Sequence, residues 1–434
     1  TAREHFKEAI NFDPKYARAY VGVADGYNLL ALYGNLPLKK ARGAAEQAID
    51  KALALDDELA EAYAARGLLY RNSDEEKAEV AFKRAIALNP NYALTYMWYG
   101  SMLQRRGKVQ VGHDLLEKAF KLDPKSPVSA YLLAQSHYSV GEEGRTMELF
   151  SHIISNDPYY PDAYNMVGKI LLKRGRLDES IGMFKRALDV DALNKGAVSG
   201  LLRANMDMGN FERTAQWFDY AQKHHELFNP AQYNSLQFRY HIAQGHRHKA
   251  FDYLNQITFE EDPGGQMKDL LDGQKAYYQG KYSDAAQAYE RVRHRDKNTE
   301  DAFYRMGGGR IAARLAFAYA QLEMTDKLNE LITGLEQYLE KNKEKTVNQS
   351  SYYYSMALIR TIQGKVIEAF YYLQGAVDVG YVQIWEAEVE PIFATIKGDI
   401  QFTLMTGSVK ERLANMRTRM ADEEAFMMAD NEEI

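Results

Sequence analysis

Cysteine is absent from this chain of 434 residues. Disulfide bonds, thiolate metal sites and cysteine nucleophiles are therefore excluded, and the composition fits either a reducing cytoplasm or a periplasm. No apolar run approaches the ~18 residues that a membrane span needs, and no secretory signal peptide is visible. Acidic residues (60) outnumber lysine and arginine (54), and no basic block occurs along the chain. We therefore expect this segment to bind no nucleic acid.

Histidines are few, but five of the ten fall in one window: His224, His225, His241, His246 and His248. Such a cluster suggests a metal site or a pH sensor, because histidine titrates near neutral pH. His241 and His246 are five positions apart, however, whereas two ligands on one helical face are four apart. We interpret the window as a solvated turn with surface histidines, and whether it senses pH or metal stays open.

Motifs for catalysis or cofactor binding are also scarce. Gly307, Gly308 and Gly309 precede Arg310 and a helical run, and a glycine-rich turn at a helix N-terminus can hold phosphate. The turn lacks the Gly-Lys-Ser/Thr ending of a P-loop, so we interpret it as a joint between repeats. Carboxylates are spread over helix surfaces in charge patterns typical of solvated faces. We expect no catalytic residues, no metal site and no cofactor, and hence no enzyme.

Glycine recurs with a fixed period of 34 residues, at Gly107, Gly141, Gly175 and Gly209. This period resembles that of tetratricopeptide repeats, each of which is a pair of helices. Other consensus positions agree with the same frame. An aromatic residue recurs at position 24 of the repeats, as Phe82, Phe150, Phe184 and Phe218, and Asp-Pro or Asn-Pro ends four of them at Pro14, Pro90, Pro124 and Pro158. The pattern predicts an all-α superhelix, or solenoid, of about ten helix pairs with a C-terminal helical cap.

The regularity of the repeats varies along the chain. We expect a regular superhelix over 1–260, degenerate repeats over 261–380, and a helical cap with a polar acidic tail over 381–434. About nine residues are inserted around Gly34-Asn35-Leu36-Pro37, and a hinge is expected near Glu260–Gly265. The first repeat lacks its first helix, so we expect Thr1 to be a boundary within a longer protein.

The first helix of each pair lines the concave face in tetratricopeptide proteins, which implies a groove that binds a protein or peptide. The candidate groove residues combine aromatic, amide and basic side chains: Met97, Gln104, Arg105, Tyr131, Gln135, Tyr138, Asn165, Lys169, Lys173 and Arg203. Tyrosine and arginine often anchor interfaces. The alternative is a solvated inner wall without a ligand. The carboxylate clamp for chaperone tails needs Lys and Asn where this chain has Met97 and Ser101, so such an adaptor is not expected.

The two ends carry more specific motifs. Residues near the start read Phe6-x-x-Ala9-Ile10-x-x-Asp13-Pro14-x-Tyr16, and those near the end read Pro391-x-Phe393-x-x-Ile396-x-x-Asp399-x-x-Phe402. They resemble the C-terminal repeat region of CadC-like membrane-integrated winged-helix regulators of bacteria, or of related cyclases. The resemblance implies repeats that lie in the periplasm and sense a signal or bind a partner. Without it, a cytoplasmic location is expected.

Three hypotheses for function follow. The first is a non-catalytic interaction or sensory module of a bacterial signalling or transcriptional regulator. The second is a freestanding scaffold for the assembly of envelope proteins, and the third is the regulatory tail of a nucleotide cyclase. All three involve a protein or peptide partner in the groove, and none excludes an oligomer.

Overall fold

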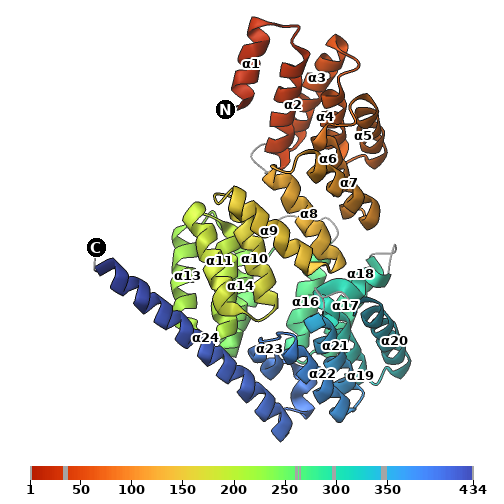
Figure 1. Ribbon diagram of the computed structural model, residues 1–434. Coiled ribbons are helices and arrows are strands. Elements are labelled where there is room, and N and C mark those ends of the chain that lie inside the picture. The colour runs from red at the N-terminus through yellow and green to blue at the C-terminus, as the bar shows by residue number, and fades with distance from the viewer. Residues whose placement is uncertain are drawn as a thin grey trace. The chain divides into compact units, whose positions relative to one another are not determined.

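The computed structural model describes residues 2–32, 38–259, 262, 265–295, 300–343 and 349–432. Over these ranges the only regular secondary structure is helical, which confirms the predicted all-α fold (Figure 1). Ten pairs of consecutive helices pack together in the described ranges, from α2 with α3 to α21 with α22. Within these ranges, no helix combines the length and apolar character that a membrane crossing would require.

The chain forms two compact units, which divide between Pro158 and Tyr159. The first unit contains α1 (Ala2–Phe12), α2 (Ala17–Leu32), α3 (Leu38–Leu55), α4 (Ala60–Tyr70), α5 (Glu75–Leu88), α6 (Ala93–Arg105), α7 (Val109–Leu122), α8 (Pro127–Val140) and α9 (Glu143–Asn156). The second unit begins with five further pairs or parts of pairs, which are α10 (Pro161–Lys173), α11 (Leu177–Val190), α12 (Lys195–Met208), α13 (Phe211–Lys223), α14 (Pro230–Ala243), α15 (Arg247–Asn255), α16 (Gln266–Tyr278), α17 (Tyr282–Arg295) and α18 (Glu300–Arg305). It continues through η1 (Met306–Gly309), α19 (Arg310–Gln321), α20 (Thr325–Asn342), α21 (Gln349–Ile362), α22 (Val366–Asp378), α23 (Ile384–Val389), η3 (Pro391–Thr395) and α24 (Ile400–Glu432).

Helix ends coincide with the proline pairs and periodic glycines found in the sequence. Helices α1, α5, α7 and α9 each stop directly before an Asp-Pro or Asn-Pro pair, because proline disfavours α conformation in the residue before it. All four periodic glycines have φ between 68° and 90°, where a residue with Cβ is strained. At Gly209 the backbone N–H donates to the carbonyls of Asn205 and Met206, which closes the last turn of α12.

Small and aromatic consensus positions pack against one another as expected. A Cβ atom at Gly168 would come within 2.7 Å of the Phe184 ring, and one at Gly200, in the next repeat, within 2.3 Å. Phe184 is fully buried and so fills the space between two repeats. Ser180 Oγ donates to the Gly168 carbonyl at 2.7 Å, which ties the two helices of one pair together. These contacts explain why the repeat needs a small residue where an aromatic ring crosses.

The C-terminal segment of the second unit does not continue the stack. Helix α24 contacts α22 and α23 and then α11 and α12, which lie some two hundred residues earlier (Figure 1). The turn after α22 lies close to the turn after α10, where two glycines face each other. A Cβ on Gly175 would lie 2.4 Å from the Gly380 carbonyl oxygen, and one on Gly380 would lie 2.3 Å from the Arg174 carbonyl oxygen. The helix predicted as a terminal cap therefore packs on the early repeats of its own unit.

The expected division by repeat regularity remains a prediction. The contacts separate the chain after Pro158, within the stretch expected to be one regular superhelix. Most of the expected hinge near Glu260–Gly265 and the insertion at Gly34–Pro37 lie outside the described residues. Asp262 is described, and its carboxylate accepts from the Lys268 N–H at 2.9 Å at the start of α16.

Candidate functional site

The second unit contains a partly open cavity of about 1070 Å³. Its walls come from α10, α12, α14 and α16, from η1 and the start of α19, and from α23. Apolar side chains cover much of the wall, among them Phe228, Phe238, Leu270, Ile311 and Trp385. The returning C-terminal segment contributes Trp385 and Glu386 of α23 to this wall.

Cations dominate the charged side chains that line the cavity. Six are basic and one is acidic: Lys169, Lys195, Arg203, Arg239, Arg310, Arg314 and Glu386. Burial and the neighbouring Arg239 lower the pKa of Arg203, and Asp207 opposes them in part. The guanidinium group of Arg239 thus disfavours the charged form of Arg203. An anion placed between them would be attracted to both.

Two arginines of α19 are neutralised by the C-terminal segment. Arg310 Nη1 donates to both carboxylate oxygens of Glu386, at 2.9 and 3.0 Å. Arg314 Nη2 donates to Glu390 Oε2 at 2.9 Å and to the Tyr278 hydroxyl at 2.8 Å. Glu390 is 1% exposed and also accepts from the Tyr277 hydroxyl. Buried charges of this kind are stable only when paired and hydrogen-bonded.

The glycine turn before α19 has a structural role in this arrangement. Gly307, Gly308 and Gly309 all have positive φ, and Ser355 Oγ donates to the Gly308 carbonyl at 2.8 Å. The turn is packed against α21 and brings Arg310 to the start of α19. It is therefore an ordered joint that orients an ion-paired arginine.

Asp207 of α12 anchors the C-terminal segment to the early repeats. It is 4% exposed, and it accepts from Gln383 Nε2 and from Trp385 Nε1, both at 3.0 Å. Arg239 lies over the Trp385 ring, 5.2 Å from its centroid. Desolvation raises the pKa of Asp207, although Arg239 and the two hydrogen bonds act in the opposite direction. The inner face of α12 is therefore partly occupied by the chain itself.

Four of the predicted groove residues lie in the second unit. Lys169 and Arg203 line the cavity and are exposed to solvent. Lys173 is also exposed, and burial of its stem lowers the pKa of its amine. Asn165 differs from the expectation, because it is 4% exposed. Its Nδ2 donates to Asn194 Oδ1 at 2.6 Å, and a buried side chain leaves a partner little surface to contact.

The other six predicted residues lie in the first unit. Met97 is 6% exposed and packs in a core cluster with Leu116 and Leu133, so it too leaves a partner little surface. Gln135 Nε2 donates to the Tyr131 hydroxyl at 3.0 Å. Tyr138 is half-buried. Gln104 donates a hydrogen bond to Ser136 Oγ. Arg105 is exposed, and burial of part of its side chain lowers its pKa. Their role in binding a partner stays a prediction.

Several cavity residues were not among the predicted groove residues, and the repeat frame could have located one of them. Lys169 and Arg203 stand at position nine of two consecutive repeats, and the same position in the following repeat is Arg239. Extending the rule by one repeat would have found it. Arg310, Arg314, Trp385 and Glu386 had no such signal, because they lie in degenerate repeats or beyond them.

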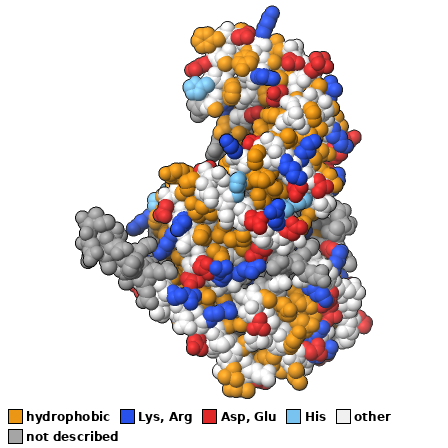
Figure 2. Space-filling view, viewed as in Figure 1, with side chains coloured by type: hydrophobic (Ala, Val, Ile, Leu, Met, Phe, Trp, Pro, Cys, Tyr) orange, Lys and Arg blue, Asp and Glu red, His pale blue; other side chains and the backbone are white. Residues whose placement is uncertain are grey.

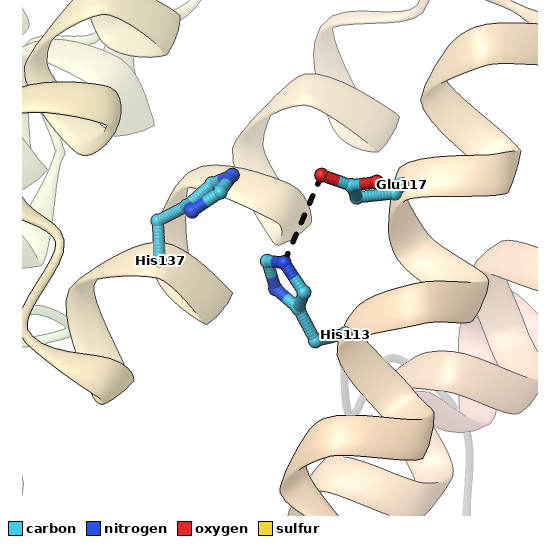
Figure 3. A group of neighbouring side chains, drawn as sticks. All are labelled: His113, Glu117 and His137. Atoms are coloured by element: carbon cyan, nitrogen blue, oxygen red, sulfur yellow. Dashed lines mark ion pairs between the residues drawn. The ribbon is translucent and has the colours of Figure 1, made fainter.

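The predicted histidine window does not converge on one point in the described part of the chain. His241 is buried and stacks on Tyr253 with ring centroids 5.4 Å apart. Burial first, and then Lys249 and His246, lowers its pKa to about 4. His225 is 93% exposed and lies near Glu226. Among the described residues, one group has metal-ligand spacing: His113, Glu117 and His137 (Figure 3).

The surface charge of the chain is mixed. On the face drawn in Figure 2, Lys and Arg side chains are interspersed with Asp and Glu, with apolar side chains between them. Mixed surface charge of this kind is ordinary. Repeat proteins bind their partners at concave surfaces.

Comparison with known proteins places the repeats in a family context. The tetratricopeptide repeat family model matches residues 166–226, which run from α10 into the turn after α13. Small glutamine-rich tetratricopeptide repeat-containing protein 2 of Mycosarcoma maydis is 26% identical over 129 residues, which are 30% of this chain and 33% of that protein. The match thus spans about a third of the curated relative's length.

Solved structures of tetratricopeptide proteins are also similar to this chain. A tetratricopeptide repeat protein from Parabacteroides merdae is 17% identical, with a TM-score of 0.48, and the match covers 59% of this chain and 98% of that one. The pilF protein of Pseudomonas aeruginosa is 16% identical, with a TM-score of 0.38, over 46% of this chain and 90% of that one. The chain contains tetratricopeptide repeats, and such repeats form extended concave surfaces that bind other proteins.

Proposed function

We propose that the chain is a non-catalytic interaction module whose second unit binds an acidic segment of a partner protein in its cavity. The observation that carries this proposal is the row of cations at position nine of three consecutive repeats: Lys169, Arg203 and Arg239. Among the described residues, none of the three forms an ion pair with a carboxylate, although all three line the cavity. An acidic partner would add negative charge to that of Asp207, which already acts on Arg203 and Arg239.

The shape and apolar lining favour a peptide over a small anion. A volume of about 1070 Å³ is at the upper end of the roughly 300–1,000 Å³ typical of small-molecule pockets. Phe228, Phe238 and Leu270 provide apolar wall beside the cations. A segment that alternates acidic and apolar side chains would match both features.

The test uses the full chain and two short labelled peptides of equal length. One peptide combines Asp and Glu with Leu and Phe, and the other has Lys in place of every acid. Fluorescence anisotropy should detect binding of the acidic peptide, and its affinity should fall with added salt. Arg203→Glu should weaken this binding at least about tenfold, since the repulsion then acts where attraction did. Trp385 fluorescence reports independently whether the peptide enters the cavity.

The matched control is Lys223→Glu, which reverses an exposed charge in the same unit away from the cavity. It changes the net charge by the same amount and should leave the affinity within about twofold. Equal binding of the acidic and basic peptides would overturn the proposal. Equal loss of affinity in the two variants would also overturn it, because only the net charge would then matter.

We further propose that this module belongs to a bacterial membrane-integrated regulator and lies in the periplasm. Support comes from the motifs at the two ends of the sequence, from Phe6 to Tyr16 and from Pro391 to Phe402. The coding sequence upstream of Thr1 tests this. A winged-helix domain followed by one apolar span would support it. A signal peptide would favour an envelope scaffold instead, and a cyclase domain would favour a regulatory tail.

A further inference from the structure

The first unit contains three potential metal ligands that converge from two neighbouring repeats. His113 and Glu117 lie four positions apart on α7, and His137 lies on α8. One ligand atom of each residue lies within 4.8 Å of the other two, and His113 Nε2 is 3.8 Å from Glu117 Oε1. Figure 3 shows the three side chains pointing toward one another across the contact between the two helices.

Each imidazole is already oriented by a partner on its other nitrogen. His137 Nδ1 lies 2.5 Å from Glu142 Oε2, and His113 Nδ1 lies 2.8 Å from Ser136 Oγ. A proton on each Nδ1 can therefore be donated outward, which leaves each Nε2 with a free lone pair. Metal-binding histidines are held in the same way, by a carboxylate or another acceptor on the second ring nitrogen.

The third ligand is placed to remain a carboxylate. Lys121 Nζ contacts Glu117 Oε2 at 3.1 Å, so Oε1 is left to face the two rings. The side chains of His113 and His137 are 13% and 7% exposed, whereas that of Glu117 is 40% exposed. An ion would thus enter past Glu117 and meet the histidines beneath it.

We propose that His113, Glu117 and His137 bind a divalent transition metal of the zinc type. Two imidazole nitrogens and one carboxylate oxygen are common Zn²⁺ ligands, and three protein ligands leave one coordination position for water or for a group from a partner. Ligand atoms about 2.1 Å from a tetrahedral ion are about 3.4 Å apart. The distance of 3.8 Å between His113 Nε2 and Glu117 Oε1 is close to that value, and all three ligand atoms lie within 4.8 Å of one another.

The site would link consecutive repeats. Helix α7 is the second helix of one pair and α8 is the first helix of the next, and the two pack directly. Ser136 also accepts a hydrogen bond from Gln104 of α6, so the site is connected to a predicted groove residue. A bound ion would hold three helices in one relative arrangement. This proposal concerns the first unit and does not depend on the cavity of the second.

The test is a zinc titration of the full chain after treatment with a chelator. Competition with a chromophoric chelator should show one Zn²⁺ bound per chain. His113→Gln and His137→Gln should each weaken the affinity at least about tenfold, and Glu142→Gln, which disturbs only the outer partner, about 10- to 100-fold. With Co²⁺ as the probe, the visible d–d spectrum of the wild-type chain should report nitrogen and oxygen ligands and should disappear in the His113 variant.

Two further variants keep the result interpretable. Glu117→Gln changes the most exposed ligand, so it tests the site even if replacement of the buried His137 unfolds the unit. His225→Gln removes a fully accessible histidine elsewhere and should leave zinc affinity unchanged. The proposal is wrong if the wild-type chain takes up no Zn²⁺, or if Glu117→Gln and His113→Gln bind it as tightly as the wild-type chain. Loss of binding in His225→Gln alone would also contradict it.

Discussion

The two units are built from the same kind of helix pair but are stabilised over different distances along the chain. In the first unit, polar contacts join neighbouring repeats, as between Gln104 and Ser136, which are 32 residues apart. In the second unit, Arg314 and Glu390 are 76 residues apart, and Asp207 and Trp385 are 178 apart. A solenoid is normally stabilised by neighbour contacts alone. The second unit adds long-range contacts, which place Trp385 and Glu386 of the returning segment in the wall of its cavity.

The largest expected difference between the units concerns their ion pairs. Glu390→Ala should destabilise the second unit by about 3–5 kcal/mol, because it removes the nearer counter-charge of the buried Arg314 and leaves only Glu386, at 4.0 Å. The exposed pair of Arg145 and Glu148 in the first unit is a matched control, with side chains 70% and 64% exposed. Glu148→Ala should cost at most about 0.5 kcal/mol.

Urea denaturation followed by tryptophan fluorescence measures both effects. Trp98 reports on the first unit, and Trp217 and Trp385 report on the second, so single-tryptophan versions separate the two transitions. A cost below about 1 kcal/mol for Glu390→Ala would mean that the buried pair contributes no more than a surface pair. The contrast between the units would then be lost.

A smaller difference is expected between two glycines at the same repeat position. Gly107 and Gly175 have φ of 80° and 68°. A Cβ at Gly107 meets nothing within 4 Å, whereas one at Gly175 would lie 2.4 Å from the Gly380 carbonyl oxygen. Gly107→Ala should cost about 1 kcal/mol from backbone strain alone, and Gly175→Ala about 2–3 kcal/mol, because a steric clash is added.

The same denaturation experiment tests this pair, with the loss followed in the unit that carries each change. Equal losses of stability in Gly107→Ala and Gly175→Ala would show that the loop of Gly380 moves away easily. The closed arrangement of the second unit would then contribute little to its stability.

The smallest effect is a pH dependence expected in the first unit. Burial raises the pKa of Asp25 to about 7 from its ordinary value of 3.8. Between about pH 4 and 7, Asp25 is therefore protonated in the folded chain and ionised in the unfolded chain. The stability of the folded chain then falls as the pH rises through this range. Asp25→Asn should remove the dependence and stabilise the first unit by about 1–2 kcal/mol at pH 8.

Denaturation midpoints measured through Trp98 at pH 5 and pH 8 give the comparison. The control is Asp114→Asn, an exposed carboxylate on α7, which should change stability little at either pH. If Asp25→Asn stabilised the unit equally at both pH values, a charged Asp25 in the folded state would be indicated, contrary to the prediction.

The candidate sites were predictable to different degrees. Position nine of the repeats selected Lys169 and Arg203, which line the cavity, and their role in binding a partner stays a prediction. The same kind of rule selected Met97 and Asn165, which the packing buries. A repeat position specifies which side of a helix a residue occupies. It does not specify how deeply the neighbouring helices cover it.

The metal candidate shows the same distinction. His113 and Glu117 had the i, i+4 spacing that the histidine window from His224 to His248 lacked, so one half of the group could have been found by inspection. His137 lies 20 positions beyond Glu117, on the next helix. Only the packing of α7 against α8 brings it to the other two (Figure 3).

Sequence alone determined the helix pairs, their ends and their stacking partners. Those features depend on local rules, which are glycine at a left-handed cap, proline after a helix, and a small residue opposite an aromatic ring. Each rule acts within one or two repeats and is therefore visible in a 34-residue period. The tertiary structure alone decided that α24 packs on α11 and α12 and that α23 packs on α14. Asp207 of α12 and Arg310 and Arg314 of α19 bind this returning segment. Contacts over such separations leave no period in the sequence, because they form only once both parts of the chain have folded.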